Sequence, residues 1–379
     1  MTDPAAAAAG EPTEAPSGPP PSRLPSRRSQ IISGLITLVV LAIVFVYLFP
    51  KMGSYADAWA YVQAMPAWSV ALLLFAVVLN LVVYVWPYTA ATPGLRFKPA
   101  FVVRQTSFLI SNTVPAGGTI GLAVQYSMLG SYGFGPAATT TTIAITSVWN
   151  LMMTLAMPVI GALALVLTGE LTGQRTLIAV VCAVIVAVMV VAMLVILRSE
   201  RGAHWFGRLC DAIARACLGV VNKLFHKTLT VDLTSSIMTF RVTVIDVLRT
   251  RWLQITVANL AMQFSAWFVL FVALRGIQAG QTTDRVTWSE SLAAFSYARV
   301  AAFIPIPPGG LGTVDAALTK LLEGYGATGS QAIAANLVWR AGTFVPQALI
   351  GVLTLVYWRA TAAKRAQTLS TSSGSAPTP

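Results

Sequence analysis

The sequence predicts an all-α integral membrane protein with about six spanning helices and two broken re-entrant helical hairpins, arranged as two inverted repeats. Apolar residue types make up 56% of the 379 residues and charged types only 10%, against about 25% charged in an ordinary soluble domain. Six segments are long and apolar enough to cross a bilayer, and two more apolar segments are interrupted by proline and glycine. A soluble core could not enclose this much apolar sequence, so part of the solvent must be lipid.

The two ends of the chain are predicted to be disordered tails around one membrane domain at 31–360. Residues 1–30 and 361–379 are rich in small residues and proline, and they cannot bury enough apolar surface to fold. The first apolar stretch, 31–49, is long enough to span and is followed by no small-residue cleavage site. It therefore predicts a membrane helix rather than a signal peptide.

The spanning helices follow from the length of each apolar run, because a span needs about 20 such residues. The third and sixth runs are long and contain Pro158 and Pro346, so we expect tilt or a kink there. The six predicted spans are 31–49, 68–88, 137–168, 176–198, 252–274 and 328–358.

The distribution of Lys and Arg predicts the orientation. With the N-terminus inside, most of these 25 residues, Arg104 among them, fall in cytoplasmic segments. This excess predicts a multi-pass membrane protein with both termini in the cytoplasm. The basic, amphipathic stretch 199–251 predicts one or two helices lying on the cytoplasmic face, or a connector pair packed on the loops. The net charge of +12 then favours anionic lipid headgroups over nucleic acid as the partner.

Two segments, 100–130 and 289–324, are predicted to enter and leave the membrane on the same side. Each is broken in the middle by Pro and Gly, which leaves halves too short to cross as straight helices. Such hairpins are tolerated only where protein or a cavity surrounds them.

The two halves of the chain, about 68–168 and 252–358, repeat the same order of motifs. With one span on each side of each hairpin, the two copies have opposite orientations, which is how many transporters build a site near the bilayer midplane. A duplication that persists as a scaffold is the alternative. The matching positions are Pro115 and Pro307 at the breaks, Asn150 and Arg340 in the following spans, and Gly161 and Gly351 beyond them.

The breaks themselves are candidate anion sites. Proline stops a helix and glycine lets backbone approach a ligand, so the following half-helix would aim free N–H groups into the membrane. The same glycines would also suit a turn that only needs close packing. The candidate residues are Pro307, Pro308, Gly309, Gly310 and Gly312 in the second break, and Pro115, Gly117 and Gly118 in the first.

Arg340 lies about midway along the last span, where a charge must face a cavity or a partner. Asp315, one turn into the second half-helix, is the expected partner, and Arg299 flanks the same break. Two interpretations stay open. The pair Arg340–Asp315 could be a purely structural ion pair, or an arginine left free could capture a phosphate.

In the first copy, Asn112, Gln125 and Asn150 supply polar groups near the break, either for a ligand or to hold helices together. Signals for an enzyme are missing: there is no nucleotide-binding loop and no histidine–carboxylate motif. We therefore expect no catalytic activity, no cofactor and no metal.

The stretch PIPPGGLGTVD resembles the lysylphosphatidylglycerol synthase transmembrane family, also called flippase-like membrane proteins. The family's second hairpin is similar to P-x-P-G-G-L-G-x-x-E, with Asp315 here in place of Glu. The first hairpin, NTVPAGG, resembles the family's N-x-x-P-x-G, but Thr119, Ile120 and Gly121 replace the usual Gly-Glu continuation, as in variants associated with actinobacteria. Lysyl transfer is not predicted, because only a tail follows the membrane domain.

The resemblance implies a unit in the bacterial plasma membrane that moves lipid between leaflets. The expected cargo is an anionic or aminoacylated phospholipid or a lipid-linked glycan, with membrane lipid or a polyprenyl-phosphate lipid as partner and envelope-biosynthesis enzymes as further candidates. The alternatives are a membrane-embedded transferase using a polyprenyl-phosphate sugar, with Asp315 as its acid or base, a non-transporting envelope scaffold, and an ion or solute transporter.

Overall fold

The computed structural model describes residues 55–113, 117–169, 173–205, 207–209, 211–212, 233–280, 285–303 and 312–373. This part of the chain is built from helices, with no strand in it. The predicted first span and the turns of both hairpins lie outside these residues. The helices are α3 (Tyr55–Gln63), α4 (Ala67–Val83), α5 (Trp86–Ala91), α6 (Phe97–Thr113), α7 (Gly117–Ser131), α8 (Pro136–Thr168), α9 (Gly173–Arg198), α11 (Leu233–Ile277), α12 (Trp288–Val300), η2 (Ala301–Phe303), α13 (Thr313–Gly324) and α14 (Gly329–Ser373).

Four of the described segments are long and apolar enough to cross a membrane, and all four lie where spans were predicted. The helix α9 occupies the position of a fifth predicted span and contributes a shorter apolar stretch. The all-α membrane class is therefore confirmed. The four segments are Ala67–Ala91, Pro136–Thr168, Val244–Ile277 and Gly329–Thr361.

Large apolar side chains form lipid-facing stripes on the outer helices. On α4 and on α14 the exposed residues recur every three or four positions, which places them on one helix face. Water would penalise such faces, whereas hydrocarbon does not. The stripes consist of Val70, Leu74, Phe75, Val78 and Val82 on α4, and Val345, Leu349, Val352, Leu353 and Val356 on α14.

Each broken segment forms a pair of short helices that pack on each other, α6 with α7 and α12 with α13. These helices have 17, 15, 13 and 12 residues, all below the length of about 20 that a span needs. Gly117 allows the first pair to pack closely, because a Cβ there would lie 2.8 Å from the backbone oxygen of Ser111.

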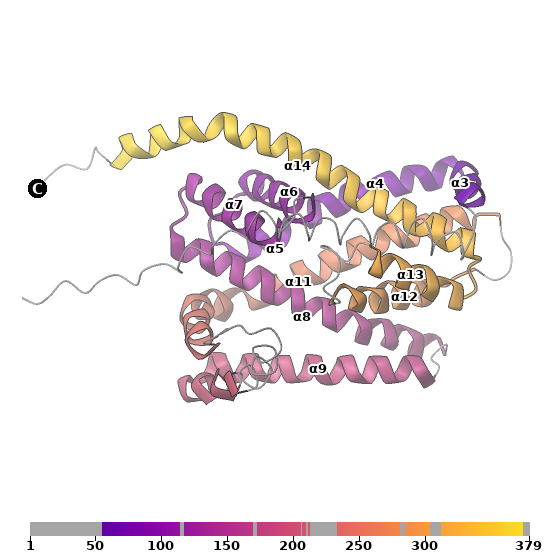
Figure 1. The fold of residues 1–379 in the computed structure, drawn as a ribbon, viewed down its shortest axis with the longest axis horizontal. Helices are drawn as coiled ribbons and strands as arrows, with labels where there is room; N and C mark the ends of the chain where they lie inside the picture. Colours follow the sequence, from indigo (N-terminus) through magenta and orange to yellow (C-terminus); the bar gives the residue numbers. More distant parts are fainter. Residues whose placement is uncertain are drawn as a thin grey trace, which may run out of the picture.

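The first spans of the two copies, α4 and α11, pack antiparallel. The start of α4 meets the end of α11, where Ser69 lies against Gly276, and further along Asn80 Nδ2 donates to Ser265 Oγ at 3.0 Å. Figure 1 shows that α8 and α14 also run in opposite directions, and that the α6–α7 and α12–α13 pairs lie towards opposite ends of these long helices. The two copies are therefore inverted, as predicted.

The last span of each copy packs on the hairpin of the other copy, α8 on α12 and α14 on α6. A glycine marks each contact. A Cβ on Gly161 would lie 2.9 Å from Ala293 Cα, and one on Gly351 would lie 2.7 Å from Gln105 O. These two glycines were matched by the sequence repeat, so equivalent positions make equivalent contacts between the copies.

Two boundaries differ from the prediction. The second part of the stretch 199–251 is no separate surface helix, because α11 runs unbroken from Leu233 to Ile277, and no Pro or Gly interrupts it before Gly276. Likewise α14 continues to Ser373, although residues from 361 on were predicted to be a disordered tail. The Ala, Lys, Arg and Gln residues that follow the span are good helix formers and extend it.

Candidate functional site

A cavity of about 410 Å³ lies between the two inverted copies. Its walls come from α4, α5, α6 and α8 on one side and from α11, α12 and α14 on the other. Half of the lining residues belong to each copy, and they include the repeat-matched positions Asn150 and Arg340. Pockets for small ligands have volumes of roughly 300–1,000 Å³, so the cavity is large enough for a polar headgroup.

Three arginines give the cavity its charge. Arg104 comes from α6 and Arg299 from α12, so the first helix of each hairpin supplies one guanidinium, and Arg340 on α14 supplies the third. Among the described residues that line the cavity there is no Asp or Glu. A concave site with this composition attracts anions.

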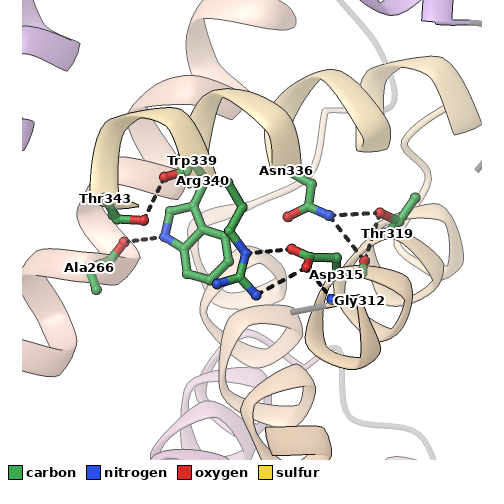
Figure 2. Close-up of polar contacts among 8 residues, drawn as sticks. All are labelled: Ala266, Gly312, Asp315, Thr319, Asn336, Trp339, Arg340 and Thr343. Atoms are coloured by element: carbon green, nitrogen blue, oxygen red, sulfur yellow. Dashed lines mark hydrogen bonds and ion pairs between the residues drawn. The ribbon is translucent and has the colours of Figure 1, made fainter. Parts of the chain in front are cut away.

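Arg340 is neutralised by Asp315, as the sequence predicted (Figure 2). Arg340 Nε donates to Asp315 Oδ1 at 2.6 Å, and Arg340 Nη2 donates to Asp315 Oδ2 at 3.2 Å. The Asp315 side chain is only 1% exposed, whereas that of Arg340 is 20% exposed. Arg340 therefore forms a bidentate ion pair with Asp315 behind the cavity wall. Only part of the Arg340 side chain is exposed to the cavity.

Hydrogen bonds from the backbone just before α13 and from a side chain of α14 hold Asp315 in place. Gly312, with φ of +89°, directly precedes α13 and donates its N–H to Asp315 Oδ2 at 2.7 Å, so the carboxylate caps this helix. On the facing turn of α14, Asn336 Nδ2 donates to the carbonyl oxygen of Asp315 at 3.1 Å (Figure 2). Trp339 Nε1 donates to the carbonyl oxygen of Ala266 at 3.0 Å and ties the same turn to α11.

Arg299 and Arg104 form no ion pair within the described residues. The guanidinium of Arg299 lies 5.3 Å from the ring centroid of Phe295 and next to Tyr84, and its buried Nε has no hydrogen-bond partner among those residues. The guanidinium of Arg104 lies 5.0 Å from the Tyr84 ring and 5.2 Å from the Phe108 ring. Aromatic faces stabilise both cations in part. Tyr84 also hydrogen-bonds to Arg299, but the Nε–H of Arg299 remains as a donor for a ligand.

The candidate residues from the sequence fall into three groups. Asn112, Asn150, Arg299 and Arg340 line the cavity. The second group is described but does not line the cavity. In it, Asp315 and Gln125 are buried, and Gly117 and Gly312 lie at helix starts. Gly118 also belongs here, and a side chain at its position would meet open space. The remaining candidates, Pro115, Pro307, Pro308, Gly309 and Gly310, lie outside the described residues.

Several lining residues escaped the sequence reasoning. Arg104 was counted among the cytoplasmic charges, although it lies within the first broken segment and in the cavity. Asn259 and Gln347 also line the cavity, and they were visible as polar residues inside predicted spans, a known mark of a functional path. Tyr84 and Tyr88 lay at the end of a span, where aromatic residues usually anchor a helix at the interface.

A family model described as "Lysylphosphatidylglycerol synthase TM region" matches residues 30–351. The chain belongs to this family. The match covers the first copy, the second copy as far as residue 351, and every residue that lines the cavity. No curated protein matches the chain.

Proposed function

We propose that this protein moves a lipid with an anionic headgroup between the leaflets of the bacterial plasma membrane, with the headgroup in the cavity and the tails in lipid. The observation that carries the proposal is the cavity charge. Three arginines line the cavity, and none of its described lining residues is an Asp or Glu. Asp315, outside the lining, neutralises the charge of Arg340 alone. Two guanidinium groups left uncompensated inside a membrane are costly, and a phosphate group would offset that cost with charge-assisted hydrogen bonds.

Among the cargo classes considered above, the cavity favours anionic phospholipids and polyprenyl phosphates over aminoacylated lipids. An aminoacylated headgroup carries an extra ammonium group, and no described lining residue offers a carboxylate to receive it. The arginines would repel that ammonium group.

The inverted copies supply a mechanism for movement. Because each copy contributes half of the cavity wall, rocking one copy against the other would open the site to one leaflet and then to the other. The contacts at Gly161 and Gly351 between each last span and the opposite hairpin are where such a motion would slide packed helices past each other.

The transferase alternative depends on Asp315 as an acid or base, and its surroundings count against that role. Its side chain is 1% exposed, and both carboxylate oxygens are engaged by Arg340 or Gly312. A general base needs to reach the proton that it removes, and this carboxylate lies behind Arg340. Transport therefore remains the better-supported function.

Replacing Arg299 with glutamine is expected to slow headgroup movement in proteoliposomes roughly tenfold or more, because a charge-assisted hydrogen bond is worth about 1.5–3 kcal/mol. Arg299→Lys should fall between wild type and glutamine, since it keeps the charge but not the planar fork. The assay follows labelled phosphatidylglycerol, a polyprenyl phosphate and phosphatidylcholine in parallel vesicles.

The matched control is Arg249→Gln, an exposed arginine near the start of the apolar segment Val244–Ile277 of α11 that does not line the cavity. It should move lipid at the wild-type rate. Wild-type rates in both Arg299→Gln and Arg104→Gln, with both variants folded by thermal unfolding, would remove the cavity from the transport path and favour the scaffold alternative.

A further inference from the structure

A second pocket, of about 340 Å³, lies between the start of α4 and the end of α11. It shares no lining residue with the central cavity. Apart from two arginines its lining is apolar and aromatic, and it includes no Asp or Glu among the described residues. The lining consists of Trp68, Leu72, Phe268, Phe271, Val272, Arg275, Ala279 and Arg285.

The pocket lies at the level of lipid headgroups. Arg275 is two residues before the end of the apolar segment Val244–Ile277, and Trp68 is one residue after the start of Ala67–Ala91. Along α11, Arg275 follows the cavity-lining residue Met262 by 13 positions, or about 20 Å at 1.5 Å per residue. Half of the hydrocarbon core is about 15 Å thick, so a cavity near the midplane puts Arg275 at the interface.

The chemistry of the pocket matches one phospholipid molecule. The guanidinium of Arg275 lies 4.9 Å from the ring centroid of Phe271, which stacks on Trp267 at 5.4 Å, so its position is fixed by aromatic contacts. Arg275 and Arg285 form no ion pair among the described residues. Two like charges at one pocket repel each other, and an anion between them relieves the repulsion.

We propose that this pocket binds an anionic phospholipid, with its phosphate between Arg275 and Arg285 and an acyl chain along Trp68, Leu72 and Phe268. Unlike the central cavity, this site lies wholly at one interface and would hold a lipid without moving it. Because Trp68 and Leu72 come from α4 and Arg275 from α11, the bound lipid would bridge the first spans of the two copies.

The test uses photoactivatable phosphatidylglycerol, with the reactive group in its acyl chain, at trace amount in phosphatidylcholine vesicles that hold the full-length protein. We expect cross-links on peptides from the start of α4 and the end of α11. Arg285→Gln should lower the yield of these cross-links roughly fivefold, because each basic residue near a membrane surface contributes about a fivefold effect on lipid binding. The double variant Arg275→Gln/Arg285→Gln should lower the yield by more than tenfold. Arg249→Gln is the matched control and should keep the wild-type yield.

Cross-links on cavity peptides, such as those around Arg299, are counted separately and should not change in these variants. This separates the two proposals, because transport can fail in Arg299→Gln while the interfacial labelling persists. Photoactivatable phosphatidylcholine that labels the pocket equally well would overturn the proposal, as would full labelling in the double variant. Arg285 is exposed, so Arg285→Gln tests the site even if the double variant unfolds.

Discussion

Replacing Asp315 with alanine should lower the free energy of unfolding by about 3–5 kcal/mol, the usual cost of breaking a buried ion pair from one side. Three interactions disappear together: both hydrogen bonds to Arg340 and the cap on the N–H of Gly312. Arg340 would then keep its charge in the membrane interior without a partner. Thermal or denaturant-induced unfolding in detergent micelles measures the loss.

The double variant Asp315→Ala/Arg340→Met should regain most of that stability, because it removes the uncompensated charge as well. The matched control is Glu323→Ala, whose partner Lys320 lies at 2.9 Å with its side chain 77% exposed. Such surface pairs contribute about 0–1 kcal/mol. A loss below 1 kcal/mol for Asp315→Ala alone would show that the pair is not a main support of the α13–α14 contact.

Alanine at Gly351 should destabilise the protein by about 1–3 kcal/mol, the usual cost of overpacking, and should also slow transport. The added Cβ would lie 2.7 Å from both the backbone oxygen of Gln105 and the Cβ of Leu109. Backbone cannot move aside, so α14 would have to shift away from α6. Unfolding in micelles and the proteoliposome assay give the two readouts.

The repeat makes a second, symmetry-related prediction. Gly161→Ala should behave like Gly351→Ala, because its Cβ would lie 2.9 Å from the backbone of Ala293 on the other hairpin. Gly130, in α7, faces open space, so Gly130→Ala is the matched control and should be neutral or stabilising by up to about 1 kcal/mol. If all three variants had the same stability, close packing between the copies would not be needed.

The sequence alone determined the class of protein, the position of the described spans and the inverted repeat. These features depend on local quantities: the length of an apolar run is set by the bilayer thickness, and Pro and Gly mark where a helix must break. It also indicated the Asp315–Arg340 pair, because a charge at mid-span needs a partner and only one carboxylate stood close to the second break.

Only the tertiary structure decided which arginines remain available to a ligand. In the sequence, Arg104 could not be told from the arginines of the cytoplasmic loops, yet it lines the cavity. Arg340 also lines the cavity, but Asp315 holds it in an ion pair. Likewise Tyr84 meets Arg104 and Arg299 only because the ends of α4 and α12 converge on the middle of α6. Such contacts join residues far apart in the chain, and periodicity does not encode them, since it fixes the face of a helix but not the neighbour that this face meets.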